Sequence, residues 1–223
     1  VDTEPAVLAG CRFVVLALPL DRLLDPAPEL LAALPAAAVI TDVGSVKLPV
    51  LERWQPLHPR FVASHPMAGT AQAGVEAGVG ALFVDRPWVA TPGPGTDPAA
   101  LAQVQALAEL LGARWLCCEA AAHDRAVALI SHLPVLVSGA LLLAADRGAR
   151  QVGDGPELVR QLASSGFADT SRVGGGNPEL GTLMARCNRE AVLAALDSYR
   201  EALDGLEQQV RQGAWSELQA ELE

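Results

Sequence analysis

The first half of the chain alternates short apolar runs with longer amphipathic segments. Residues 13–18 form a continuous apolar run that Pro19 ends, which is typical of a strand buried on both faces. Because short connections between alternating strands and helices place the strands parallel, the pattern predicts a doubly wound α/β sheet up to about residue 118. The further predicted strands are 37–41, 60–63, 88–91 and 113–117, and the predicted helices are 21–34, 45–54 and 98–111.

After residue 118 only helical periodicity remains. Asn177-Pro178-Glu179 combines an N-cap, a proline at the first helical position and an acidic first turn, which together predict a helix start. We therefore expect two domains, an α/β domain at 1–118 and an all-helical domain at 119–223. The helices predicted in the second are 121–146 (with a kink at Pro134), 156–164, 177–212 and 216–223.

The predicted helix at 177–212 carries a heptad seam. Its apolar residues recur at spacings of four and three, at Val192, Leu196, Tyr199, Leu203, Leu206 and Val210. Such a seam favours antiparallel or intersubunit packing, and hence a homodimer formed through the helical domain. Ordinary packing within one chain produces the same pattern, and both readings stay open at this point.

Composition narrows the class of protein. The chain is 51% hydrophobic and 19% charged, which indicates a well-buried globular protein. Its net charge of −10 argues against nucleic acid or an anionic membrane surface as a partner, although a locally basic pocket could still bind an anionic small molecule. The apolar segment 126–145 contains Ser131, His132 and Pro134, so we interpret it as a buried helix and not a membrane span.

The four cysteines lie at no metal-binding spacing, so we expect no metal site and a reduced, cytoplasmic protein. The chain opens on Val1 and contains no strand followed by a G-x-G-x-x-G turn, the signature that should begin a dinucleotide-binding domain. We therefore expect the sheet to be incomplete and the chain to be a fragment or trimmed form that binds NAD(P) poorly.

His65 is the first candidate for chemistry. It lies in the run Ser64-His65-Pro66-Met67-Ala68-Gly69-Thr70, at the end of a predicted strand. Ligands of open α/β sheets bind at the carboxyl ends of the strands, so an imidazole there is well placed to act on one.

Ser45 follows another predicted strand, in Thr41-Asp42-Val43-Gly44-Ser45-Val46-Lys47. A hydroxyl at the same sheet edge as His65 could donate to a cofactor amide or orient the imidazole. The alternative is that Ser45 caps the following helix and that Lys47 is a solvated surface charge.

The remaining histidines are weaker candidates. His132 lies in the apolar helix, where it could bind a substrate carboxylate or be a buried residue satisfied by a carbonyl that Pro134 frees. His123, nine residues earlier, falls on the opposite face of a regular helix, so the two imidazoles cannot hold one metal ion. His58 lies between prolines and is expected in an exposed loop.

Arg172 is the candidate for carboxylate recognition, because a guanidinium binds a carboxylate through two hydrogen bonds. It follows Phe167-Ala168-Asp169-Thr170-Ser171 and precedes Val173 and three glycines, which could form an anion cradle. A surface pair between Arg172 and Asp169 is the alternative.

These segments, in this order, resemble the prephenate/arogenate dehydrogenase family over essentially the whole chain. The matching runs are Leu18-Pro19-Leu20, Asp42 to Lys47, Ser64 to Thr70, Ser131-His132-Leu133-Pro134, Ser164-Ser165-Gly166-Phe167 and Asp169 to Arg172. The run Val173-Gly174-Gly175-Gly176-Asn177-Pro178-Glu179-Leu180-Gly181 is most similar to cyanobacterial-type arogenate dehydrogenases.

The resemblance implies an incomplete Rossmann-like domain followed by a helical dimerisation domain, and an NAD- or NADP-dependent oxidative decarboxylation in tyrosine biosynthesis. His65 would accept the proton of the ring hydroxyl as general base, and Ser45 would orient His65 or the nicotinamide. His132, Arg172 and Thr70 would bind the substrate, while Leu18, Pro19 and Leu20 would line the cofactor.

The chain departs from the family pattern at Ala168, where members often carry a basic residue. Two alternatives remain: another two-domain dehydrogenase of the hydroxyacid type, and a cofactor-deficient fragment that only dimerises. The choices between NAD and NADP and between arogenate and prephenate also stay open, with the glycine-rich run favouring arogenate.

Overall fold

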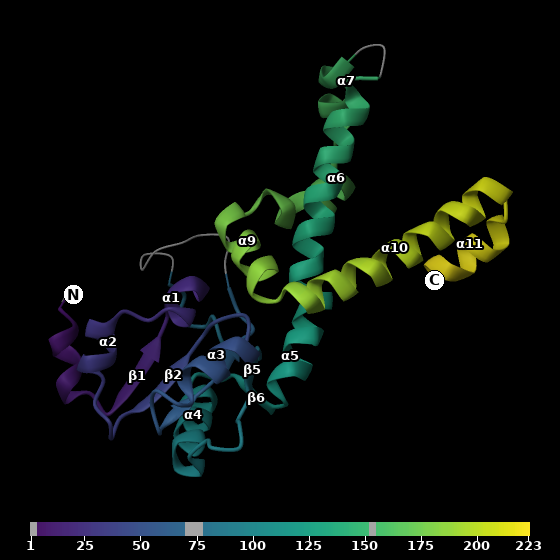
Figure 1. The fold of residues 1–223 in the computed structure, drawn as a ribbon. Helices are drawn as coiled ribbons and strands as arrows, with labels where there is room; N and C mark the ends of the chain where they lie inside the picture. Colours follow the sequence, from purple (N-terminus) through teal and green to yellow (C-terminus); the bar gives the residue numbers. More distant parts are fainter. Residues whose placement is uncertain (1–3, 70–77, 152–154) are drawn as a thin grey trace.

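The computed structural model describes residues 4–69, 78–151 and 155–223. Its amino-terminal half is an α/β layer, and its carboxyl-terminal half is a set of helices (Figure 1). The second half begins at α5 (Ala120–Val127).

Two three-stranded sheets build the α/β domain. In the first, β1 (Phe13–Leu16), β2 (Val39–Asp42) and β3 (Phe61–Val62) run parallel in that order. After Ala63 the chain continues from β3 into β4 (Ser64–Pro66), which begins the second sheet. Figure 1 shows the helices packed against these strands.

The second sheet corrects the expectation that all strands are parallel. Its order is β4, β5 (Pro87–Ala90), β6 (Arg114–Cys117), and β4 pairs antiparallel with β5, while β5 and β6 are parallel. Residues 78–86, on the connection between β4 and β5, form turns and no crossover helix. Parallel pairing requires a long crossover, whereas antiparallel pairing does not.

Prolines mark the starts of several helices in this domain. The single helix expected at 21–34 is wrong: α1 (Leu20–Leu24) and α2 (Pro28–Ala33) are separate, because Pro26 disfavours helical backbone at Asp25. Helix α3 (Leu48–Trp54) starts later than expected, so Ser45 lies outside it. Helix α4 (Pro98–Leu110) is capped by Asp97, whose carboxylate accepts from the backbone of Ala99.

Packing of α3 against the sheet forms much of the core. The Trp54 side chain is fully buried, stacks on Phe61 with ring centroids 5.5 Å apart, and donates from Nε1 to the carbonyl of Leu23. The same core contains β1 and β2 side chains, so it fixes the carboxyl ends of these strands relative to α3.

The helical domain is built on one long interrupted helix. Helix α5 passes through a π-helical turn, η3 (Ala128–His132), into α6 (Leu133–Ala149). Pro134 has no N–H to donate, and the Leu133 amide bonds to Ala128 five residues back, so the predicted kink is realised as a widened turn. Beyond it lie α7 (Gly155–Leu162), α8 (Ser165–Ser171), the 3₁₀ turn η4 (Arg172–Gly175), α9 (Pro178–Cys187), α10 (Arg189–Gln212) and α11 (Trp215–Leu222).

The helix expected at 177–212 is broken at Asn188. The predicted start is confirmed, since Asn177 Oδ1 accepts from the amides of Glu179 and Leu180. At Asn188 the backbone leaves helical geometry (φ −121°, ψ 36°), and α9 and α10 become separate helices. The Asn188 side chain is turned into the interior, where its Nδ2 donates to the backbone carbonyl of Asp124.

The long apolar helix is less buried than expected. The stretch Ala120–Ala149 is long and apolar enough to cross a bilayer, and 22% of its most apolar window is buried in this chain. Leu129, Ile130 and Leu143 are exposed. Figure 1 shows α6 and α10 projecting away from the α/β domain.

One of the three consecutive glycines has a packing role. A Cβ on Gly174 would lie 2.4 Å from the Gly139 nitrogen and 2.5 Å from the Ser138 carbonyl carbon, both in the backbone of α6. The Gly174 amide also donates to Ser138 Oγ at 2.8 Å. Close approach of η4 to α6 therefore requires a residue without a side chain here.

We expect Gly174→Ala to destabilise the protein by about 1–3 kcal/mol, because the added methyl group forces η4 away from α6. Urea unfolding measures the loss. Gly175→Ala is the matched control, since nothing lies within 4 Å of its Cβ position. Equal midpoints for the two variants would contradict the packing argument.

Candidate active site

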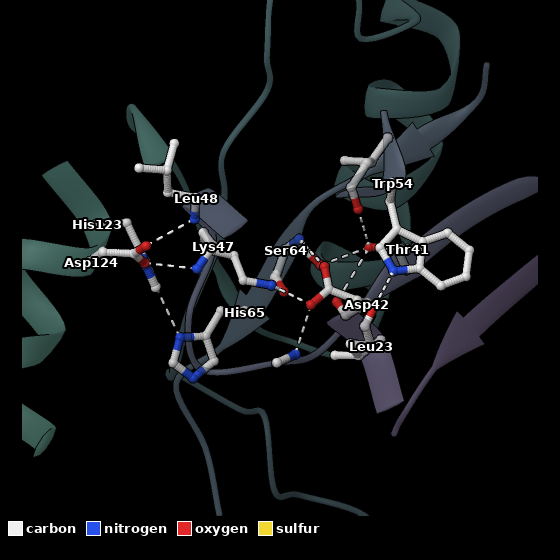
Figure 2. A network of polar contacts seen from close by, with 12 residues as sticks. Leu23, Thr41, Asp42, Lys47, Leu48, Trp54, Ser64, His65, His123 and Asp124 are labelled. Carbon is white, nitrogen blue, oxygen red and sulfur yellow. Dashed lines mark hydrogen bonds and ion pairs between the residues drawn. The ribbon is translucent and has the colours of Figure 1, made fainter. Parts of the chain in front are cut away.

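A buried ion pair organises the carboxyl end of β2. Asp42 and Lys47 have fully buried side chains and form a salt bridge (Figure 2). Asp42 also accepts from the amides of Gly44 and Ser64, and Lys47 Nζ donates to the Ser64 carbonyl at 2.7 Å. The alternative reading of Lys47 as a solvated charge is therefore wrong; the lysine joins the turn after β2 to β4.

His65 lies on β4, next to this ion pair. Its Nδ1 is 2.9 Å from Nε2 of His123, and Nδ1 of His123 is 2.8 Å from Oδ1 of Asp124. The Asp124 carboxylate also accepts from the amides of Lys47 and Leu48, at the start of α3. Figure 2 shows the resulting row of side chains, which connects the helical domain to the sheet edge.

The direction of these hydrogen bonds follows from the Asp124 carboxylate at one end of the row. A carboxylate only accepts, so Nδ1 of His123 carries a proton, and when the ring holds a single proton its Nε2 carries the lone pair. His65 must then donate from Nδ1, which leaves the lone pair of His65 on Nε2. Burial lowers the pKa of His65 well below its ordinary range, and the charge of Lys47 lowers it further. The arrangement therefore gives a neutral imidazole whose lone pair lies on Nε2, the nitrogen that does not contact His123.

His132 is buried in a different environment from His65. It lies in the π turn, is 2% exposed, and its Nδ1 is 3.2 Å from Nδ2 of Asn188. The reading in which a carbonyl satisfies the ring is wrong: among the described residues Nε2 is buried without a hydrogen-bond partner. Burial lowers the pKa of His132 to about 4, so this ring is also neutral near pH 7.

Ser45 is not a helix cap. Its Oγ is buried and has no hydrogen-bond partner among the residues that the structure describes. Buried hydroxyls without a partner are rare, and such a group at the edge of a sheet is available to a ligand. Leu18, Pro19 and Leu20 follow β1; Leu20 is buried in the core, Leu18 is half-buried and Pro19 is exposed.

The other predicted substrate residues do not join this cluster. Arg172 is exposed on η4, which packs on α6, and no hydrogen bond or ion pair links it to the histidines in the described part of the chain. Its surface pair with Asp169 is likewise not formed there. Thr70 lies outside the described residues.

Sequence reasoning missed four residues of the site: Asp42, His123, Asp124 and Asn188. His123 was expected on the far side of a regular helix from His132, but a π turn lies between them and rotates the chain less per residue than the regular helix assumed there. The adjacent His123-Asp124 pair on an otherwise apolar helix was a signal that could have identified the site. His58, expected in an exposed loop, is buried and lies between the Arg60 amide and the Pro35 carbonyl.

A Rossmann-like domain followed by a helical domain, with an imidazole at the sheet edge, is typical of two-domain nucleotide-dependent dehydrogenases. Family models assign both halves: "Prephenate dehydrogenase, nucleotide-binding domain" matches residues 2–117, and "Prephenate dehydrogenase, dimerization domain" matches 119–223. The chain belongs to the prephenate dehydrogenase family. The alternative of a different hydroxyacid-type dehydrogenase is thereby set aside.

Individual relatives agree with this assignment. The chain is 29% identical to the prephenate dehydrogenase of Bacillus subtilis over 95% of its own length and 58% of that protein's length. Arogenate dehydrogenase from Synechocystis is 42% identical with a TM-score of 0.82, over 99% of this chain and 79% of that one. Prephenate dehydrogenase from A. aeolicus, in complex with hydroxyphenyl propionate and NAD+, is 28% identical with a TM-score of 0.90, over 99% and 77%.

Proposed function

We propose that the complete protein oxidatively decarboxylates arogenate or prephenate with NAD or NADP, and that His65 is its general base. The observation that carries this proposal is the hydrogen-bonded row Asp124, His123, His65, which leaves a lone pair on His65 Nε2 to accept a proton. The 42% identity to an arogenate dehydrogenase supports arogenate as the substrate. The four free thiols fit a reduced, cytoplasmic setting.

In this mechanism His65 Nε2 accepts the proton of the hydroxyl on ring carbon C4. A bound nicotinamide supplies the acceptor for the hydride that leaves the same carbon. Loss of the ring carboxylate as CO2 then makes the ring aromatic, which renders the reaction effectively irreversible. His132, Arg172 and Thr70 are proposed to bind substrate oxygens and carboxylates.

Part of a cofactor site is available for the nicotinamide end. Ser45 Oγ has no hydrogen-bond partner among the described residues, so we propose that it bonds to the carboxamide or orients His65 once the cofactor is bound. Leu18, Pro19 and Leu20 follow the neighbouring strand β1. This sequence contains no G-x-G-x-x-G turn of the kind that binds a pyrophosphate in such folds.

A direct assay tests the proposed function. Purified complete protein would be offered arogenate, prephenate and a small β-hydroxyacid, each with NAD and with NADP, and nicotinamide reduction would be followed by absorbance. We expect reduction coupled to CO2 release with a cyclohexadienyl acid. Preference for the hydroxyacid would overturn the proposal.

Ser45→Ala should lower kcat/KM about tenfold, since one hydrogen bond to the cofactor or to His65 is worth about 1.4 kcal/mol at most. Steady-state kinetics at varied dinucleotide separate the two roles: a raised KM for the dinucleotide indicates binding, and a lowered kcat indicates orientation of His65. Ser216→Ala removes an exposed hydroxyl on α11 and should leave both constants unchanged. Unchanged constants in Ser45→Ala would show that Ser45 has neither role.

We further propose that the helical domain forms a homodimer. The heptad seam on α10 is buried at its start, where Val192 is 4% exposed, and open at its end, where Leu203 and Val210 are 47% and 53% exposed. A second copy would cover this open end and the apolar faces of α6. The match of residues 119–223 to a dimerization domain supports this, and the alternative of a chain that only dimerises rests on the same seam.

A further inference from the structure

Asn188 occupies a special place between α9 and α10. Its side chain is 7% exposed, and its Nδ2 donates to the backbone carbonyl of Asp124 at 2.7 Å. The same nitrogen lies 3.2 Å from Nδ1 of His132. A carbonyl oxygen can only accept, so the contact with Asp124 fixes the orientation of the amide and directs its NH₂ group toward both partners.

This orientation determines where His132 carries its proton. Because Asn188 presents a donor, Nδ1 of His132 must accept, and the proton of the neutral ring then lies on Nε2. That nitrogen is buried and has no partner among the described residues. His132 therefore presents a buried N–H group, whereas His65 presents a lone pair.

We propose that Asn188 is a positioning residue that fixes the Nε2–H tautomer of His132, so that His132 donates a hydrogen bond to a negatively charged oxygen of the substrate. The hydrogen bond from His132 to the substrate rests on the proposed function, whereas the tautomer of His132 does not depend on it. Asp124 links the two imidazoles: its carboxylate orients His123 and through it His65, and its backbone carbonyl orients Asn188 and through it His132.

The four histidines of the chain make the tautomers directly measurable. A long-range ¹H–¹⁵N spectrum of the ring nitrogens at neutral pH distinguishes Nδ1–H from Nε2–H imidazole. We expect the Nε2–H pattern for His132 and for His58, whose Nδ1 accepts from the Arg60 amide. We expect the Nδ1–H pattern for His65 and His123. An Nδ1–H pattern for His132 in the unmodified protein would overturn the proposal, whatever its activity.

Two substitutions extend the test. Asn188→Ala removes the donor and should give His132 a mixture of tautomers, while Asn188→Asp replaces the donor with an acceptor and should place a proton on Nδ1. Asn177→Ala is the matched control at the other end of α9; it should leave the His132 signals unchanged. A His132 pattern that stays Nε2–H in both Asn188 variants would show that Asn188 does not set the tautomer.

Kinetics then test the donor role separately. In the complete enzyme, Asn188→Ala should raise KM for the cyclohexadienyl substrate about tenfold and change kcat less, because the lost interaction binds substrate and not the reacting proton. Changed tautomers with an unchanged KM would refute the role in substrate binding while leaving the positioning role intact.

Discussion

Replacement of His65 by Asn in the complete enzyme should lower kcat by about two to four orders of magnitude, the range associated with loss of a general base. Asn retains a polar group near Nε2 of His123 but cannot take up the hydroxyl proton. The loss should therefore fall on kcat at saturating substrate and cofactor, measured by nicotinamide absorbance. The KM for substrate should change much less.

His58→Asn is the matched control for this experiment. His58 is also buried and has both ring nitrogens in hydrogen bonds, but with the Pro35 carbonyl and the Arg60 amide, away from the site. It should lose stability and retain kcat. If His65→Asn instead kept kcat and only raised KM, His65 would be a binding residue and the proposed mechanism would be wrong.

The pH profile follows from the same burial. The active form of a general base is neutral, and burial together with Lys47 lowers the pKa of His65 well below 6.5. The kcat/KM profile should therefore stay level through pH 6.5 and fall only in more acidic solution. The free energy of unfolding should decrease as the pH falls from about 6.5 toward 4. In that interval His132 is protonated in the unfolded chain, whereas in the folded protein its pKa is lowered to about 4.

Local patterns predicted the elements well where local physics decides them. The cap at Asn177 and the apolar strands are properties of a few neighbouring residues, and the structure confirms them. The break at Asn188 and the π turn at 128–132 were missed, because each depends on contacts with distant parts of the chain. Asn188 leaves the helix to reach Asp124, 64 residues away.

In the candidate site, too, local features could be predicted from the sequence and long-range contacts could not. His65 and Ser45 were chosen as candidates because each follows a predicted strand, and ligands of open α/β sheets bind at the carboxyl ends of strands. Their surroundings could not be predicted: His65 meets His123 across 58 residues, and Asp124 binds the amide of Lys47 across 77. Lys47 itself was misread, since lysine is almost never fully buried unless it is paired, and its partner Asp42 was not recognised.

Lys47→Met should destabilise the protein by about 3–5 kcal/mol, the cost typical of removing one member of a buried ion pair. Asp42 would remain fully buried, and among the described residues only the amides of Gly44 and Ser64 would then stabilise its charge. Chemical unfolding in urea measures the loss. Arg150→Met is the control, because its pair with Asp146 is solvent-exposed and should contribute less than about 1 kcal/mol.

A double variant separates the charge from the packing. Asp42→Asn combined with Lys47→Met removes both charges, so its loss should be smaller than the sum of the two single losses. Equal midpoints for Lys47→Met and Arg150→Met would show that the buried pair does not stabilise the fold.

In any variant that stays folded, removal of the Lys47 charge should raise the pKa of His65 and move the acid limb of the kcat/KM profile to higher pH. The ion pair would then serve catalysis as well as folding, because the same ammonium group that anchors β4 to the turn after β2 also keeps the base beside it unprotonated.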